Sequence, residues 1–387
     1  MTFGSGSSDG RQHDRVEYVE FGSPRERGPG WLTRLVLICL VIVAVVVVVV
    51  VGRSVHRHGT VAQPPRPRPL PPVRVVDVGH RLLGVTAGWE LFGLDQTDVI
   101  AIQFAHGRII RTALPPPVGS GPVSFLVGPR AAIIRPLDNA PGYLVPYGDQ
   151  ARPLTGTLAA GDLLLPGPRP SQEWVVGGSS SSLSLVTAGG HATSVHITLP
   201  TSDWAVQSAM SDGRGGVLVS SIATGAQYDA TPGTLRRVGA ILAAVGPQRW
   251  LGVSCGSARC RNVVINPATG AHRVLPGPAL QLFTWPWPFE AGAVAPNGSA
   301  AAVVVRGGGD SVALDLISLT SGAVSRIPVP VNQNSSSETL VWSPDSQWLF
   351  VLSADGKLLA VNAHSHRVQS LGVSLPRFTQ LAVSPAG

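Results

Sequence analysis

Short apolar stretches alternate with turns rich in glycine and proline from residue 79 to the end of the chain. Stretches this short fit β-strands, because an amphipathic helix repeats its apolar positions about every 3.6 residues over roughly ten residues or more. Eight such turns recur with a period of about 43 residues, which is typical of proteins whose repeats each form one small folded unit. The turns are centred on Ala87, Pro129, Pro168, Asp212, Pro247, Pro296, Pro344 and Pro385.

The last full repeat shows the unit most clearly. Its second and third strands are joined by Asp355-Gly356, which predicts a tight hairpin because glycine tolerates the positive φ that such turns require. The four strands predicted in this repeat span residues 338–342, 348–353, 357–361 and 367–371. Tryptophan opens the second strand in alternate repeats, at Trp89, Trp174, Trp250 and Trp348.

The stretch Trp342-Ser-Pro-Asp-Ser346, followed by a strand and Asp355-Gly356, resembles the WD40-like repeats of TolB-type β-propellers. The resemblance is close over residues 290–387 and diffuse over 79–289, and the Gly-His and Trp-Asp pairs of true WD40 repeats are missing. It implies an all-β ring of about seven four-stranded blades. A pair of β-sandwiches is the main alternative, but it does not explain the repeat period. We therefore expect a β-propeller over residues 79–387.

The two ends of the repeat region predict how the ring closes. Residues 379–384 match the inner strand that opens each repeat, whereas the first repeat, near Gly88, has no such strand before it. We expect residues 379–384 to supply the missing strand. Pairing the two ends in this way would cover both open sheet edges.

A different pattern precedes the repeats. Leu35–Val51 are seventeen consecutive apolar residues and end in seven valines. As a helix this run would be about 26 Å long, close to the roughly 30 Å hydrocarbon core of a bilayer. In lipid a lone segment satisfies its backbone amides only as a helix, so the weak helix propensity of valine does not argue against one. We expect one transmembrane α-helix over residues 31–52.

Two other interpretations of this run are weaker. A buried core helix would carry a polar face, and this run has none. A cleaved secretory signal has some support, because Thr60-Val61-Ala62 loosely resembles a small-residue cleavage site. However, the apolar run exceeds the roughly 7–15 residues usual for a signal, and the lead before it is long.

The segments around the predicted helix differ in composition. Residues 1–30 mix glycine, serine and charges without periodicity, which predicts a disordered tail. Residues 53–78 form a linker rich in proline and arginine, within which residues 63–73 favour a stiff polyproline II spacer about 30 Å long. Basic residues flank both ends of the helix, so the positive-inside rule does not orient it. We expect a cytoplasmic tail and an extracytoplasmic propeller, because long domains cross membranes largely regardless of charge.

The net charge of +7 is unevenly distributed along the chain. Residues 53–78 carry +4, whereas the much longer stretch 79–387 carries only +3. No basic stripe interleaved with aromatic residues is present, which argues against nucleic acid as a partner. The basic linker would lie near lipid headgroups, or it is simply a solvated segment. The membrane partner that we expect is the bilayer itself, through residues 31–52.

Cys255 and Cys260 are the only two cysteines after the apolar run. They are separated by Gly-Ser-Ala-Arg, a turn-like connection between two apolar strands at 250–254 and 261–265. Two cysteines at hairpin distance favour a disulfide over a pair of free thiols, and a disulfide would indicate oxidising surroundings. A metal site would need further ligands, and none is spaced nearby.

The repeat region contains little that indicates catalysis. It has no His-Glu-x-x-His helix, no Gly-x-Ser-x-Gly elbow and no phosphate-binding loop. His364 and His366 lie close together without a carboxylate, so we expect no metal site there. Asp95 and Asp98 fall between predicted strands and are explained as part of a solvated loop. We therefore expect no catalytic residues, no metal and no cofactor.

The segment Thr284-Trp-Pro-Trp-Pro-Phe-Glu290 is an insertion between the fifth and sixth repeats. Three aromatic side chains held apart by prolines would form a rigid surface able to bind a sugar or a partner protein. Alternatively they pack down and cover the adjoining blade edges, since large aromatic side chains are mostly buried. Trp285, Trp287 and Phe289 are the candidate residues for binding a ligand or partner.

The order of anchor, spacer and propeller predicts a single-pass cell-membrane protein. Its extracytoplasmic ring would act as a binding or scaffold module for an unidentified protein or glycan of the cell envelope. The alternative is an extracytoplasmic propeller hydrolase or lyase that acts on carbohydrate or peptide. A sensor with a signalling tail is a weaker third, because residues 1–30 carry no recognisable signalling domain. Propellers host many functions, so the fold alone does not decide between these.

Overall fold

The structure is a computed structural model, and its well-placed residues belong to a compact unit that spans Pro69–Gly387. The predicted tail, the predicted membrane helix and residues 53–71 of the linker lie outside the described residues. Within the described part of the chain, no helix is long and apolar enough to cross a bilayer. The structure describes residues 72–115, 123–136, 142–154, 162–169, 171–177, 182–187, 191–200, 206–221, 225–257, 259–280, 292–306, 312–331 and 338–384.

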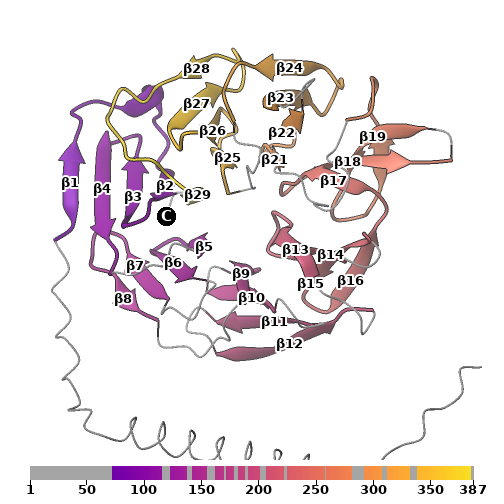
Figure 1. The fold of residues 1–387 in the computed structure, drawn as a ribbon, viewed down its shortest axis with the longest axis horizontal. Coiled ribbons are helices and arrows are strands. Elements are labelled where there is room, and N and C mark those ends of the chain that lie inside the picture. Colours follow the sequence, from indigo (N-terminus) through magenta and orange to yellow (C-terminus); the bar gives the residue numbers. More distant parts are fainter. Residues whose placement is uncertain are drawn as a thin grey trace, which may run out of the picture. The chain divides into compact units, whose positions relative to one another are not determined.

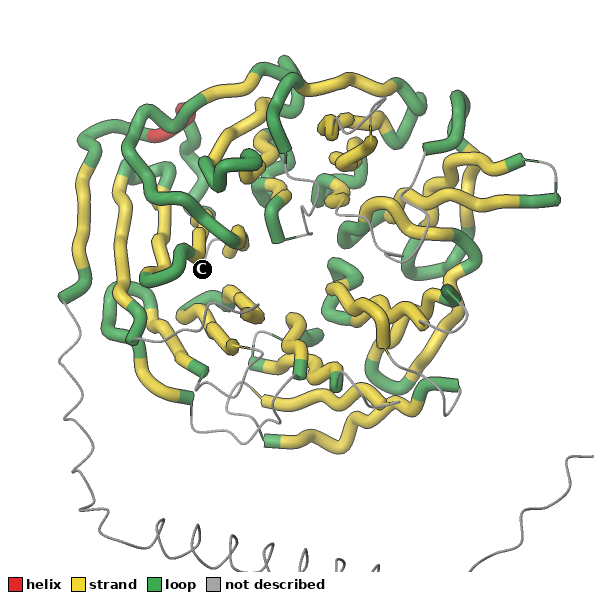
Figure 2. Tube along the Cα trace, viewed as in Figure 1, coloured by secondary structure: helices red, strands yellow, loops and turns green. Residues whose placement is uncertain are grey.

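Seven antiparallel sheets follow one another around a central axis, as Figures 1 and 2 show. The predicted all-β propeller and its number of blades are therefore confirmed. Six sheets have four strands and one has five. We number the blades by the order of their turns along the chain.

The strands of each blade are given from the axis outward. Blade 1 consists of β29 (Gln380–Ser384), β2 (Glu90–Leu94), β3 (Asp98–Gln103), β4 (Arg108–Ala113) and β1 (Arg74–Asp77). Blade 2 consists of β5 (Val123–Val127), β6 (Ala131–Pro136), β7 (Tyr143–Pro146) and β8 (Arg152–Pro153). Blade 3 consists of β9 (Leu163–Pro166), β10 (Gln172–Val176), β11 (Ser182–Thr187) and β12 (Ala192–Thr198). Blade 4 consists of β13 (Val206–Ser211), β14 (Val217–Ser221), β15 (Gln227–Thr231) and β16 (Thr234–Val238).

The remaining three blades follow the same plan. Blade 5 consists of β17 (Ile241–Ala244), β18 (Trp250–Cys255), β19 (Cys260–Ile265) and β20 (His272–Val274). Blade 6 consists of β21 (Gly292–Val294), β22 (Ala300–Arg306), β23 (Val312–Ser318) and β24 (Val324–Ile327). Blade 7 consists of β25 (Leu340–Trp342), β26 (Trp348–Leu352), β27 (Leu358–Asn362) and β28 (Val368–Gln369). A short 3-10 turn, η1 (Leu82–Gly84), lies between β1 and β2.

The burial of each strand follows from its place in the blade. Every residue of β14 and β26, both second strands, is buried, because neighbouring blades cover both faces of the sheet there. Every residue of the outermost strand β20 is exposed. The apolar clusters accordingly lie between blades. Trp89, Phe104 and Phe350, for example, join blades 1 and 7, with ring centroids 4.7 to 5.7 Å apart.

The ring closes as the sequence predicts. β29 pairs with β2 in antiparallel register, from Glu90 opposite Ser384 to Leu94 opposite Gln380. The side-chain amide of Gln380 also donates to the carbonyl of Val123 in blade 2, at 2.7 Å. The two ends of the repeat region are thus joined within one sheet.

Blade 1 has one strand that the sequence pattern did not indicate. β1 lies in the range expected to be linker, yet it pairs with β4, with Val75 opposite Ile110. Both Val75 and Val76 are exposed, at 50% and 57%. Without a buried face, this strand has none of the alternation that would have marked it.

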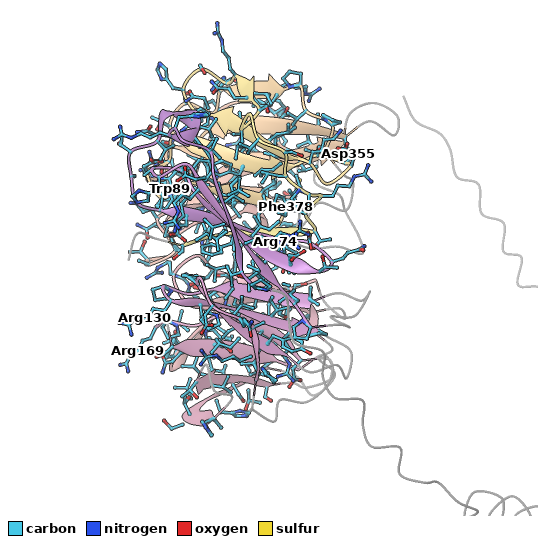
Figure 3. All side chains as sticks on the ribbon, turned by 90° about the vertical axis from the view of Figure 1, so that its left-hand side faces the viewer. Arg74, Trp89, Arg130, Arg169, Asp355 and Phe378 are labelled. Atoms are coloured by element: carbon cyan, nitrogen blue, oxygen red, sulfur yellow. A yellow bond between two sulfur atoms is a disulfide. The ribbon has the colours of Figure 1, made fainter. Side chains whose placement is uncertain are left out.

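The antiparallel strands give the ring two distinct faces. The turns between first and second strands, and between third and fourth, lie on one face, which we call the turn face. The hairpins between second and third strands lie on the other, the hairpin face. Figure 3 shows Arg130 and Arg169 on the turn face and Asp355 on the hairpin face. β1 starts at the hairpin face, so the chain enters the ring there.

Candidate functional site

The aromatic residues proposed from the sequence, Trp285, Trp287 and Phe289, lie outside the described residues. Their binding role therefore stays a prediction. Pro278 and Leu280, which precede this segment in the chain, are held by hydrogen bonds. The side chain of Asn262 accepts the backbone N–H of Leu280 and donates to the carbonyl of Pro278, both at 2.8 Å.

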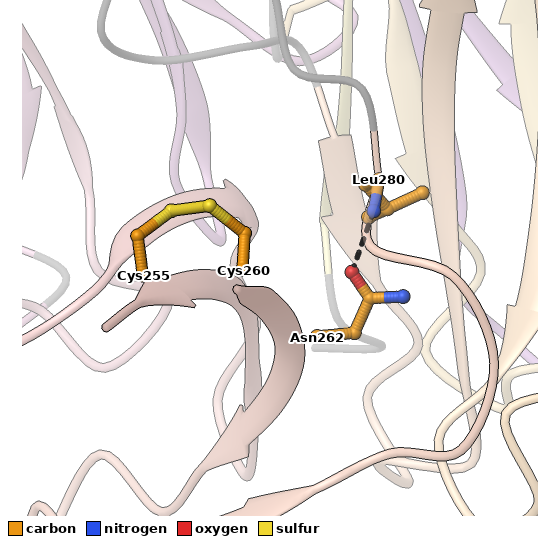
Figure 4. The surroundings of a disulfide bond; sticks show 4 residues. All are labelled: Cys255, Cys260, Asn262 and Leu280. Carbon is orange, nitrogen blue, oxygen red and sulfur yellow. Dashed lines mark hydrogen bonds between the residues drawn. A yellow bond between two sulfur atoms is a disulfide. The ribbon is translucent and has the colours of Figure 1, made fainter. Parts of the chain in front are cut away.

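Cys255 and Cys260 form the predicted disulfide, at the end of the hairpin between β18 and β19 (Figure 4). The two residues are directly opposite each other in the strand register, with Cα atoms 3.9 Å apart. This hairpin reaches outward from the ring in Figure 1. Both cysteines are exposed, so the disulfide links two strands at the surface rather than in the core.

Metal-binding side chains do not gather in the described part of the chain: no three His, Cys, Asp or Glu residues lie close enough together to hold an ion. His364 and His366 lie in an exposed turn, as the sequence suggests.

Three buried aspartates on third strands each face an arginine on the fourth strand of the same blade. The pairs are Asp98–Arg111, Asp229–Arg236 and Asp315–Arg326, with nitrogen–oxygen distances of 2.5, 2.9 and 2.9 Å. The solvated-loop explanation of Asp95 and Asp98 is therefore wrong: the two residues are only 9% and 6% exposed, and Arg111 compensates their charge. The arginine lies thirteen positions away from Asp98, so only strand pairing reveals it.

A second carboxyl lies beside the pair in blade 4. Asp212 is fully buried, and its Oδ1 accepts the backbone N–H groups of Arg214 at 2.6 Å and Gly216 at 2.7 Å. Burial, together with the charge of Asp212, raises the pKa of Asp229 to about 6. One carboxyl oxygen of each aspartate, Oδ2 of Asp212 and Oδ1 of Asp229, has no hydrogen-bond partner in the described structure. This arrangement fixes the turn after β13.

A cavity of about 110 Å³ lies between blades 4 and 5, beside Arg236, Trp250 and His272. Two of the polar side chains that line it are engaged within the protein. The guanidinium of Arg236 donates to Asp229 and to the carbonyl of Pro267, and the indole N–H of Trp250 donates to the carbonyl of Asp212.

Glu173 is the most strongly perturbed carboxyl of the second strands. It is 5% exposed in β10, and burial raises its pKa to about 7, although the nearby guanidinium of Arg135 acts in the opposite direction. Arg135 also lies near Asp162. Burial therefore favours the protonated form of Glu173.

We expect the propeller to lose stability as the pH rises from about 5 to 8. The pKa of Glu173 is about 7 in the folded protein against 4.5 for a free glutamate, so folding favours the protonated form. In this window the unfolded chain releases its proton first, which lowers the free energy of unfolding. Glu173→Gln should be more stable than the wild type at pH 8 by roughly 1–3 kcal/mol, and this difference should be much smaller at pH 5.

Urea unfolding at both pH values would measure this effect. Asp149→Asn is the control, because Asp149 is exposed and its pKa lies below its ordinary value, outside the window. A difference between Glu173→Gln and the wild type that does not change with pH would contradict the prediction.

The first-to-second-strand turns pack against one another around the axis, and we call them the turn collar. A Cβ on Gly215 of blade 4 would lie 2.4 Å from the Cα of Pro168 in blade 3. On the other side, a Cβ on Gly213, which has a φ of +78°, would lie 2.7 Å from the carbonyl carbon of Gly246 in blade 5. Only glycine permits both the backbone conformation and this approach. The collar comprises residues 128–130, 167–169, 212–216, 246–249, 295–299 and 343–347.

The alternating tryptophans hold this collar together. Trp174 in blade 3 and Trp250 in blade 5 donate their indole N–H groups to the carbonyls of Gly215 and Asp212 in blade 4, at 2.8 and 3.1 Å. Trp89 in blade 1 donates to the carboxylate of Asp345 in blade 7, at 3.1 Å. Sequence reasoning found these tryptophans as markers of the repeat but not their bonds to neighbouring blades. The collar is thus a rigid surface at the inner rim of the turn face.

No family model and no curated protein matches the chain. Among solved structures, a 6-phosphogluconolactonase-like protein from Bacteroides fragilis is similar at 9% identity and a TM-score of 0.49, over 78% of this chain and 99% of that one. A protein from Lactobacillus plantarum is similar at 13% identity and a TM-score of 0.48, over 76% and 99%. A puromycin-hydrolyzing peptidase from Mycobacterium tuberculosis is similar at 13% identity and a TM-score of 0.49, over 75% and 53%. Similarity at this level does not extend to function. The chain is a seven-blade β-propeller, and its function has to be argued from its own residues.

Proposed function

We propose that this chain is a single-pass membrane protein whose extracytoplasmic propeller is a binding or scaffold module for a protein or glycan of the cell envelope. Residues 31–52 would span the bilayer, with residues 1–30 in the cytoplasm. The TolB-type relationship of the repeats belongs to the same proposal. No catalysis is part of this function.

The observation that carries the proposal is the closed ring with its rigid collar. β29 joins the last repeat to the first, and tryptophan side chains fix the turns of neighbouring blades. A surface held in this way binds a ligand without the entropic cost of ordering loops. The exposed disulfide adds support for the location, because disulfides persist in oxidising compartments.

Location is tested with the full chain carrying a tag at either end in a bacterial host. The proposal predicts that the protein resists carbonate extraction from membranes. It also predicts that protease added to intact spheroplasts removes the C-terminal tag and spares the N-terminal one. Release of the whole protein by carbonate would reject the anchor, and protection of the C-terminal tag would reject the orientation.

The binding role is tested by capture of ligands from native membranes with the full-length protein. Trp285→Ala/Trp287→Ala should retain at least about 10-fold less of a specific ligand, because central aromatic residues carry much of the binding energy at interfaces. Val274→Ala/Val324→Ala is the matched control, since these valines are exposed apolar residues at 45% and 54%. Equal loss in both variants would show that the aromatic segment is not the binding site.

A hydrolase or lyase is the second candidate, and one observation favours it. Glu338 directly precedes the innermost part of blade 7, and burial raises its pKa to about 7, the range that suits a general acid or base. Under this alternative, the purified full chain would cleave a model glycoside or peptide. Glu338→Gln would abolish that turnover. Glu173 has a similar pKa but lies away from the axis, so Glu173→Gln would leave the turnover intact.

A further inference from the structure

Four consecutive blades each place an arginine in the turn collar. Arg130 and Arg169 each end a Gly-Pro-Arg turn in blades 2 and 3, and Arg214 and Arg249 occupy the corresponding turns in blades 4 and 5. The first three are exposed, and Arg249 is half-buried. Because these turns all lie on one face, the four guanidinium groups follow an arc along about half of the ring. Figure 3 shows Arg130 and Arg169 projecting from that face.

The charge of this arc is offset by described residues only at Arg214, which interacts with the buried carboxylates of Asp212 and Asp229. Within the described parts of the chain, none of the four arginines makes a salt bridge. The described collar holds two carboxylates. Asp212 is buried, and Asp345 lies in blade 7, outside the arc, where it accepts hydrogen bonds from Trp89 and Ser343. The exposed charges of the arc are therefore all positive.

Contacts within the collar hold two of these turns in place. The turn that carries Arg214 is clamped by Trp174 and Trp250 from both neighbouring blades. The aliphatic part of Arg249 lies over Gly298 of blade 6. A Cβ added to Gly298 would lie 3.2 Å from the side-chain carbons of Arg249. The turns are thus ordered before any ligand arrives, which raises affinity for a ligand whose charges match their spacing.

We propose that this arginine arc binds a linear polyanion, an acidic glycan whose repeating units carry phosphate or carboxylate groups. Guanidinium groups bind both anions through paired N–H donors. Cations on four successive blades lie one after another rather than converging on one point. A chain of repeated charges can contact them in succession, whereas a single small anion reaches only part of the arc.

Two other partners fit the arc less well. Among the described residues, the exposed large apolar side chains are Val75, Val76, Ile241, Val274 and Val324, and none of these lies in the collar. A protein partner would be expected to bury an apolar or aromatic centre, and a lipid surface to receive apolar side chains. The chain, moreover, enters the ring at the opposite, hairpin face.

This inference names the ligand class of the proposed scaffold and rests on that proposal for its cellular setting alone. The test uses the full chain in nanodiscs of zwitterionic lipid. Its probes are inorganic polyphosphate, polygalacturonate and, for lipid headgroups, phosphatidylglycerol vesicles. Arg130→Gln/Arg169→Gln/Arg214→Gln/Arg249→Gln should bind the polymers about 10- to 100-fold more weakly than the wild type, from the loss of four exposed ion pairs.

The control variant removes the same charge from other exposed arginines, as Arg74→Gln/Arg259→Gln/Arg261→Gln/Arg377→Gln. It should bind the polymers as the wild type does. Binding of polyphosphate alone, or of polygalacturonate alone, supports the proposal and identifies the anion. If the collar variant melts early, Arg130→Gln/Arg169→Gln repeats the comparison.

Three results would overturn the proposal. The first is equal loss of binding in both variants, which would mean that only net charge matters. The second is binding to phosphatidylglycerol vesicles without binding to either polymer. The third is no binding to any of the probes. If a ligand captured from membranes is still held in that last case, the scaffold function stands and only the ligand class is wrong.

Discussion

Deletion of residues 379–387 is expected to prevent the ring from folding. The deletion removes β29, so the inner edge of β2 loses its pairing from Glu90 to Leu94. It also exposes the core between blades 1 and 7, where Leu381 is 3% exposed. Because every blade packs on two neighbours, an open ring loses contacts on both sides of the gap. The loss should exceed about 5 kcal/mol, comparable with the whole stability of a typical domain.

Thermal unfolding of the full chain and of the truncated chain, followed by circular dichroism, measures this loss. A chain that lacks only residues 385–387, which follow β29, is the control and should melt as the wild type does. A cooperative transition at the wild-type temperature after deletion of 379–387 would show that the paired strand is dispensable.

Trp250→Ala is expected to cost about 3–5 kcal/mol of stability, in the upper range for a buried aromatic residue. Trp250 is fully buried and packs with Leu218 of blade 4 and Val263 of blade 5. The substitution leaves a large cavity between the two blades. It also leaves the carbonyl of Asp212 without its indole donor, which lies 3.1 Å away.

Trp250→Phe separates these two contributions. It keeps most of the buried ring and removes the hydrogen bond, so we expect a smaller loss of about 1–2 kcal/mol. Guanidinium unfolding curves of both variants would provide the values. A loss below about 1 kcal/mol for Trp250→Ala would mean that the collar does not depend on this contact.

The propeller could be predicted because its signals are local and repeated. Apolar stretches of strand length, an average period of about 43 residues and recurring turn residues each reflect contacts between neighbouring strands. Even ring closure was predictable, since the last stretch resembles an inner strand and the first repeat lacks one. β1 was missed for the converse reason: its valines are exposed, so burial imposed no pattern on them.

The candidate sites were less accessible to sequence reasoning. Asp98 was assigned to solvent because its partner Arg111 approaches only when β3 and β4 pair. The two Gly-Pro-Arg stretches are predictable as turns between strands. Nothing in the local sequence shows that their arginines share a face with Arg214 and Arg249. The repeat of this tripeptide was the one signal that could have led to them.

The sequence by itself predicted the all-β class, a ring of about seven blades and the closing strand, and it favoured the disulfide. It also carries the prediction of a membrane helix, because an apolar run is a property of consecutive residues. Only the tertiary structure decided which charges are buried together, which tryptophans clamp neighbouring turns, and which arginines form one arc. The buried charge pairs join residues 7 to 13 positions apart that meet only when strands pair. The tryptophan bonds join residues 38 and 41 positions apart and exist only after the blades have packed around the axis.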